Sequence, residues 1–224
     1  MIIFDVRVLI LQLKGKKIIF LGDSITEGVG VSSVDKRYAD VFANITEVES
    51  YVNYGISATR IARQQKIQDE YVDTRAFTER FEHMDEDADI VVVFGGTNDY
   101  GHGDAPFGML GDRTNESYCG AVHVLMKGLI KKYPMSTIVF MTPLHRECEY
   151  VPNPTTGREL KAYVDVIRTV AEYYSIPVLD LYATAGICPD IKEQKELLCP
   201  DGLHPNDAGS RIIAERLKYF LESL

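Results

Sequence analysis

The sequence predicts a three-layer α/β/α sandwich with about five parallel strands. Short apolar runs without strict alternation recur along the chain, which is typical of strands buried on both faces of a parallel sheet. Amphipathic stretches of helical periodicity lie between the later runs, and no repeat or Pro/Gly/Ser-rich linker divides the chain. Alternating strands and helices imply right-handed βαβ crossovers within one domain.

The elements follow one another in a regular order. The predicted strands are residues 17–21, 50–53, 90–94, 137–141 and 177–181. Helices with one apolar face are predicted at 116–133, which Pro134 ends, and at 158–174. A last helix begins after Asn206 or Asp207 as its N-cap.

The first 14 residues are predicted to be an N-terminal extension or an extra strand, ahead of a domain that spans 15–224. This apolar stretch has no basic segment in front of it, Asp5 and Arg7 interrupt it, and no small-x-small cleavage site follows. It is also too short and too charged to span a bilayer. We therefore expect neither a signal peptide nor a membrane span, and the sequence favours a cytoplasmic protein while leaving secretion open.

The composition and the spacing of cysteines, histidines and glycines argue against several classes of partner and cofactor. A net charge of −9 repels phosphate backbones and anionic lipid, so we expect no nucleic-acid or membrane partner and favour a small neutral molecule. The four cysteines form no C-x-x-C pair and the five histidines form no H-E-x-x-H motif, so no metal site is predicted. No phosphate-binding glycine loop is present, and no cofactor is implied.

Four polar segments stand at the ends of predicted strands or just before the last helix. They are Gly22-Asp23-Ser24, Asn53-Tyr54-Gly55, GGTNDYG at 95–101 and DGLHPN at 201–206. Each segment alone is also typical of an ordinary turn. Ligands of parallel sheets bind outside the carboxyl ends of the strands, so we expect the segments to meet at one edge.

Taken in order, the segments resemble the blocks of the SGNH (GDSL) hydrolases, a family of esterases and lipases: G-D-S, a lone Gly, G-x-N-D and D-x-x-H. The resemblance covers nearly the whole chain and implies a flavodoxin-like fold and a serine esterase. It assigns Ser24 as nucleophile and His204 as its base, with Asp201 orienting the base.

The chemistry of ester attack also needs donors where negative charge develops on the carbonyl oxygen. The resemblance points to the backbone N–H groups of Ser24 and Gly55 and to the side-chain amide of Asn98. The neighbouring acids, Asp23 and Asp99, are interpreted as structural residues that accept hydrogen bonds from loop amides.

The substrate is predicted to be a small ester with a short acyl group, most simply acetyl, on a carbohydrate or another small polar alcohol. A long acyl chain needs an apolar groove, whereas the two long loops at this edge, 100–115 and 144–157, are mostly polar. Within them, Tyr100 and Tyr150 can pack on a sugar face. A lysophospholipase or thioesterase, an acyltransferase, and a non-catalytic binding module remain alternatives, and the oligomeric state is open.

Overall fold

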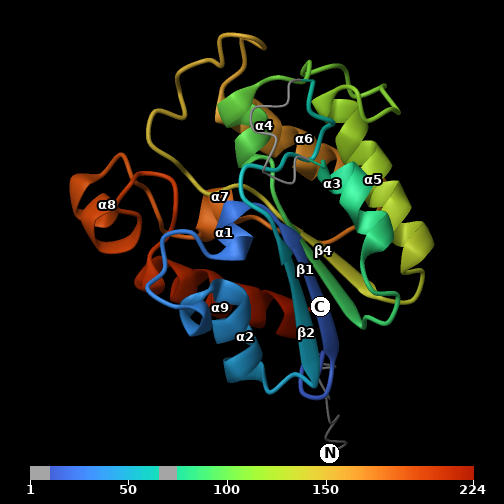
Figure 1. Ribbon diagram of the computed structural model, residues 1–224, viewed down its shortest axis with the longest axis vertical. Coiled ribbons are helices and arrows are strands. Elements are labelled where there is room, and N and C mark those ends of the chain that lie inside the picture. The colour runs from blue at the N-terminus through green and yellow to red at the C-terminus, as the bar shows by residue number, and fades with distance from the viewer. Residues whose placement is uncertain (1–10, 66–74) are drawn as a thin grey trace, which may run out of the picture.

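A computed structural model describes residues 11–65 and 75–224, and it has the predicted α/β/α architecture (Figure 1). One sheet of five parallel strands has the order β2-β1-β3-β4-β5. The strands are β1 (Lys17–Gly22), β2 (Ser50–Gly55), β3 (Ile90–Phe94), β4 (Thr137–Met141) and β5 (Val178–Leu179). All five predicted strands are confirmed, although β5 is shorter than expected.

Helices cover both faces of the sheet. The α-helices are α1 (Ser24–Glu27), α2 (Tyr38–Thr46), α3 (Phe77–Arg80), α4 (Thr97–His102), α5 (Tyr118–Lys132), α6 (Leu160–Tyr173), α7 (Leu181–Thr184), α8 (Lys192–Leu198) and α9 (Asp207–Glu222), with 3-10 turns η1 (Val34–Lys36) and η2 (Phe81–His83). In Figure 1, α2 and α9 lie on one side of the sheet and α3, α5 and α6 on the other. The predicted cap of the last helix is confirmed, since the Asn206 side chain accepts from the N–H groups of Ala208 and Gly209.

The core explains why the strands read as continuous apolar runs. Along β1, Ile18 and Phe20 pack into the layer of α2 and α9, whereas Ile19 and Leu21 pack into the layer of α5 and α6. All four side chains are buried. Successive residues of a strand point to opposite faces, so a sheet covered on both sides needs an apolar residue at every position.

The strand order creates a switch point between β1 and β3. The chain leaves β1 for β2 on one side and then returns to place β3 on the other side. The carboxyl ends of β1 and β3 are therefore neighbours, and the connections that follow them diverge to opposite sides. Such a point is the usual ligand site of an open parallel sheet.

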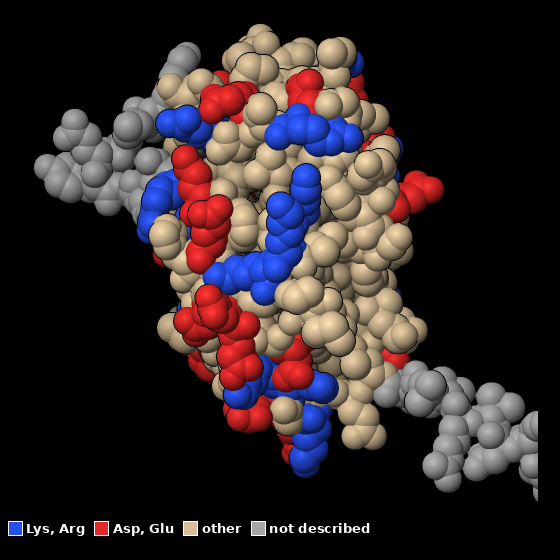
Figure 2. All heavy atoms as spheres, turned by 90° about the vertical axis from the view of Figure 1, so that its right-hand side faces the viewer, with Lys and Arg blue, Asp and Glu red and all other residues tan. Residues whose placement is uncertain are grey.

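The predicted N-terminal extension falls mostly in residues 1–10, which lie outside the described residues, and residues 11–14 form no strand. All four cysteines are free thiols. Within the described ranges, no helix is long and apolar enough to cross a membrane. On the face that carries α5, acidic and basic side chains lie interspersed among uncharged ones (Figure 2).

Candidate active site

The turn from β1 into α1 places Ser24 at the carboxyl edge of the sheet. A Cβ atom at Gly22 would lie 1.9 Å from Thr26 Oγ1, so only glycine lets the strand turn directly into the helix. Asp23 caps the helix, because its carboxylate accepts the N–H of Ile25 at 3.0 Å. The predicted structural role of Asp23 is thus confirmed, and Ser24 is the first helical residue, 7% exposed.

Asp201 and His204 form a compact turn that faces this serine. Asp201 Oδ1 accepts the backbone N–H of His204 at 2.7 Å, and Oδ2 lies 2.6 Å from His204 Nδ1. At the other side of the ring, His204 Nε2 lies 2.9 Å from Ser24 Oγ. An ionised carboxylate can only accept, so Nδ1 carries the proton and Nε2 accepts from the Ser24 hydroxyl. The three residues predicted as a triad are therefore brought together in a hydrogen-bonded chain.

The ionisation of Asp201 suits this chain of hydrogen bonds. Burial by itself would raise the pKa of Asp201, but the hydrogen bonds from the His204 backbone, the His204 ring and the Leu203 backbone outweigh it and lower that pKa below its usual range. The carboxylate therefore stays charged at neutral pH and holds the imidazole in one tautomer.

Asn98 enters the same site from the switch point. It lies in α4, just after β3, and is 5% exposed. Its Nδ2 donates to the carbonyl oxygen of Thr59 at 3.1 Å, which leaves the second amide hydrogen for another acceptor. The neighbouring Asp99 accepts the N–H groups of Ile61 and Ala62 at 3.0 and 2.9 Å, which confirms its structural role.

Gly55 does not fit its predicted role as an oxyanion donor. Its N–H donates to Asn53 Oδ1 at 2.8 Å and is therefore already engaged within the end of β2. The absence of a side chain has another reason: a Cβ atom would lie 2.2 Å from the backbone nitrogen of Glu27. The glycine lets the end of β2 pack directly against α1.

Ala58 offers the backbone donor that Gly55 does not. Its φ of +61° is rare for a residue with a side chain and costs about 1–2 kcal/mol. The preceding Ser57 donates its N–H to Glu27 at 2.6 Å, and the following Thr59 accepts from Asn98, so the Ala58 peptide is held between α1 and α4. Among the hydrogen bonds of residues 11–65 and 75–224, none uses the Ala58 N–H. No glycine or turn signal in the sequence indicated this residue.

Arg60 holds the carbonyl side of the Ala58 peptide. No role for this residue was predicted from the sequence either. Its Nη1 donates to the carbonyl oxygen of Ala58 at 3.1 Å, and its Nε lies 3.0 Å from Asp104 Oδ1. The side chains of both charged residues are almost fully buried, at 3% and 6% exposure. Such an ion pair in a buried loop fixes the local backbone, because moving either partner would leave a buried charge unpaired.

The two tyrosines predicted to bind a sugar have different environments. Tyr100 is 7% exposed, and its hydroxyl lies 3.0 and 2.8 Å from the carbonyl oxygens of Cys148 and Val151, which share its one hydrogen. This corrects the prediction for Tyr100, whose ring is buried and whose hydroxyl anchors the 144–157 loop. Tyr150 is 62% exposed, so a role in substrate binding stays a prediction for that residue.

The model of the GDSL-like lipase/acylhydrolase family matches residues 20–212. The fold is similar to that of a Lactobacillus plantarum protein, with 33% identity, a TM-score of 0.81 and coverage of 94% of this chain and 98% of that chain. The lipase/acylhydrolase from Enterococcus faecalis is 20% identical, with a TM-score of 0.61 and coverage of 91% and 94%.

An acetyl xylan esterase also shares the fold, at 22% identity and a TM-score of 0.61, with 90% of this chain and 97% of that chain covered. A search of curated proteins gives no match. In the part of the chain that the structure describes, no group of three or more His, Cys, Asp and Glu residues could hold a metal ion. With the family model matching most of its length, the chain belongs to the GDSL-like lipase/acylhydrolase family, a family of ester-cleaving hydrolases.

Proposed function

We propose that the protein is a serine ester hydrolase that works through an acyl-enzyme. The observation that carries this proposal is the chain of contacts from Ser24 Oγ to His204 Nε2 at 2.9 Å and from His204 Nδ1 to Asp201 at 2.6 Å. A serine hydroxyl is a weak nucleophile until a base removes its proton, and this arrangement supplies the base and its orienting acid.

The reaction has two halves. Ser24 Oγ attacks the ester carbonyl while His204 Nε2 takes its proton, and the resulting imidazolium then protonates the alcohol oxygen as the bond to it breaks. The acyl group remains on Ser24. Water next gives a proton to His204 and attacks the acyl carbon, and the proton returns to Ser24 as the carboxylic acid leaves.

The proposed oxyanion donors are the N–H groups of Ser24 and Ala58 and the Nδ2 of Asn98. Ala58 takes the place predicted for Gly55, because its N–H is free among the described contacts and its neighbours are tied to α1 and to Asn98. Donors fixed in advance stabilise the charged intermediate without reorganising.

The Asn98 donor can be tested by substitution. Asn98→Ala should lower kcat by about 10²–10³-fold with little change in KM, because the contact strengthens mainly in the transition state. Steady-state kinetics on a soluble acetyl ester measures both constants. A loss confined to KM would instead assign Asn98 to ground-state substrate binding.

The proposed substrate is a short-acyl ester, most simply acetyl, of a carbohydrate or another small polar alcohol. The polar composition of the 100–115 and 144–157 loops supports this choice. Burial of an acyl chain contributes about 0.8 kcal/mol of binding free energy per CH₂, and only an apolar groove can provide that burial. The fold itself is also used by an acetyl xylan esterase and by a two-domain esterase active on acetylated mannans.

Acyl preference is measured by comparing kcat/KM for acetyl, butyryl, octanoyl and palmitoyl esters below their micellar concentrations. We expect a maximum at acetyl and a decline as the chain lengthens. A maximum at octanoyl or beyond would favour the lysophospholipase or thioesterase alternative. No turnover of any ester by the wild type, together with binding of acetylated sugars, would favour the non-catalytic binding module.

A further inference from the structure

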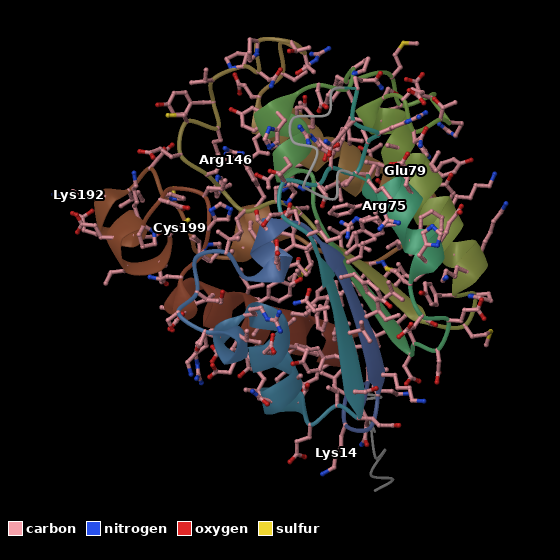
Figure 3. The ribbon with its side chains drawn as sticks, in the orientation of Figure 1. Lys14, Arg75, Glu79, Arg146, Lys192 and Cys199 are labelled. Carbon is pink, nitrogen blue, oxygen red and sulfur yellow. The ribbon has the colours of Figure 1, made fainter. Side chains whose placement is uncertain are left out.

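Arg146 follows β4 and lies above α1, near the carboxyl edge of the sheet (Figure 3). Its Nη1 donates to the carbonyl oxygen of Thr97 at 3.2 Å and contacts Thr97 Oγ1 at 3.3 Å. The guanidinium carbon lies 5.4 Å from the centroid of the Tyr100 ring. These contacts hold the charged group beside the residue that precedes Asn98.

The guanidinium of Arg146 has no counterion of its own. No carboxylate of the described residues lies within ion-pair distance of it, and its buried Nε has no hydrogen-bond partner there. By contrast, Arg37 is paired with Asp40 and Arg60 with Asp104. Burial lowers the pKa of Arg146, and the neighbouring Tyr100 hydroxyl and the carboxylates of Asp23, Asp201 and Glu149 only partly oppose this.

The loop that carries Arg146 is attached to the turn that carries His204. The N–H of Glu147 donates to the carbonyl oxygen of Gly202 at 2.8 Å, and Lys195 pairs with the Glu147 carboxylate at 2.8 Å. Arg146 therefore lies between the start of α4 and the Asp201–His204 turn. A surface cavity of about 410 Å³ adjoins it, and its wall includes Tyr100, Val151, Asn153 and Glu147, whose carboxylate is paired with Lys195.

In the proposed mechanism, the alcohol portion of the substrate is the part that comes near the Arg146 guanidinium. His204 protonates the departing alcohol oxygen, so the alcohol portion lies on the His204 side of the scissile bond. A partly buried guanidinium without a counterion gains most from a planar or tetrahedral anion that accepts two hydrogen bonds. The net charge of −9 repels anions at long range, but a short-range pair away from bulk water outweighs that repulsion.

We propose that Arg146 binds an anionic group, a carboxylate or a phosphate, on the alcohol portion of the substrate, and so selects acetylated acidic sugars or related polar acids. This inference rests on the proposed ester hydrolysis and replaces the neutral partner expected from net charge. Removing the guanidinium should lower selectivity for the anion by about 10–100-fold, the range of a charge-assisted pair.

The first test measures binding and needs no turnover. Calorimetry on Ser24→Ala protein compares methyl glucuronoside, glycerol 3-phosphate and neutral methyl glucoside. We expect at least one anion to bind about 10–100-fold more tightly than the glucoside, and which anion does so separates carboxylate from phosphate recognition. Adding Arg146→Met should remove this preference.

The matched control is Arg158→Met, which removes an exposed guanidinium that also lies over an aromatic ring, 5.3 Å from the Phe107 centroid. It should keep the preference. Arg146→Gln is the second variant, because its amide can still donate to Thr97 if Arg146→Met does not fold. Equal binding of anions and glucoside, or a preference that survives both Arg146 variants, would refute the proposal.

The second test measures the ratio of kcat/KM for acetylated methyl glucuronoside to that for acetylated methyl glucoside. The wild-type ratio should exceed one and should fall in Arg146→Gln, mainly through KM. An equal loss on both esters would mean that Arg146 only supports the Thr97 turn, and would overturn the proposal. Retained anion binding without hydrolysis of any ester would contradict the proposed function and leave the anion site standing.

Discussion

Ser24→Ala is expected to remove nearly all ester hydrolysis, with kcat lower by at least about 10⁴-fold, while the protein remains folded. The hydroxyl is the proposed attacking group, and no other described side chain lies in its place next to His204 Nε2. Folding should persist because the substitution removes one oxygen atom at the end of a strand and leaves the cap by Asp23 intact. Turnover of a nitrophenyl acetate and thermal unfolding measure the two effects.

Ser32→Ala is a suitable control for this experiment. The Ser32 hydroxyl donates to Asp207, three residues after His204, at 2.6 Å, so the change removes another serine hydroxyl without touching the triad. We expect its activity to remain within a few-fold of wild type. An active Ser24→Ala protein, or loss of its fold, would contradict the proposed role of the nucleophile.

His204→Ala is expected to have an effect of similar size, because the Ser24 hydroxyl then has no base, and residual activity should come only from the oxyanion donors and substrate binding. In the wild type, kcat/KM should fall as the pH decreases, since a protonated imidazole cannot accept the Ser24 proton. Asp201 stays ionised across this range because its pKa is lowered, so it does not cause the fall.

The measurement is a pH profile of kcat/KM for wild type, His204→Ala and Asp201→Asn. In the wild type we expect kcat/KM to fall as the pH decreases. In His204→Ala we expect most turnover to be lost and this pH dependence to disappear. Asp201→Asn should lose roughly 10⁴-fold through the wrong tautomer of the ring. A wild-type profile that is flat from acid to neutral pH, with chemistry rate-limiting, would argue against His204 as the base.

The sequence by itself determined the fold and the order of its parts. Burial on both faces requires apolar residues at successive positions of a strand, so each strand could be located from its run of consecutive apolar residues. The D-x-x-H segment was also readable, because Asp201 and His204 are three residues apart and meet within a single turn. The cap formed by Asp23 is local as well, because its partner Ile25 is two residues away. Asp99 instead accepts from Ile61 and Ala62, 38 and 37 positions away, and its structural role was predicted because the triad already had its carboxylate.

Only the tertiary structure decided how the distant segments meet. Ser24 and His204 are 180 positions apart, and the sheet order brings them within hydrogen-bond distance. Gly55 and Ala58 could not be told apart in sequence, because the partner of each amide and a φ of +61° depend on packing against α1 and α4. The burial of Tyr100 and the position of Arg146 over its ring could not be predicted from the neighbouring residues, because both depend on contacts between segments that are far apart in the chain. The periodicity of a strand or helix can be recognised in consecutive residues. The burial of a side chain and the hydrogen-bond partner of an amide depend on contacts that form only when the helices pack on the sheet.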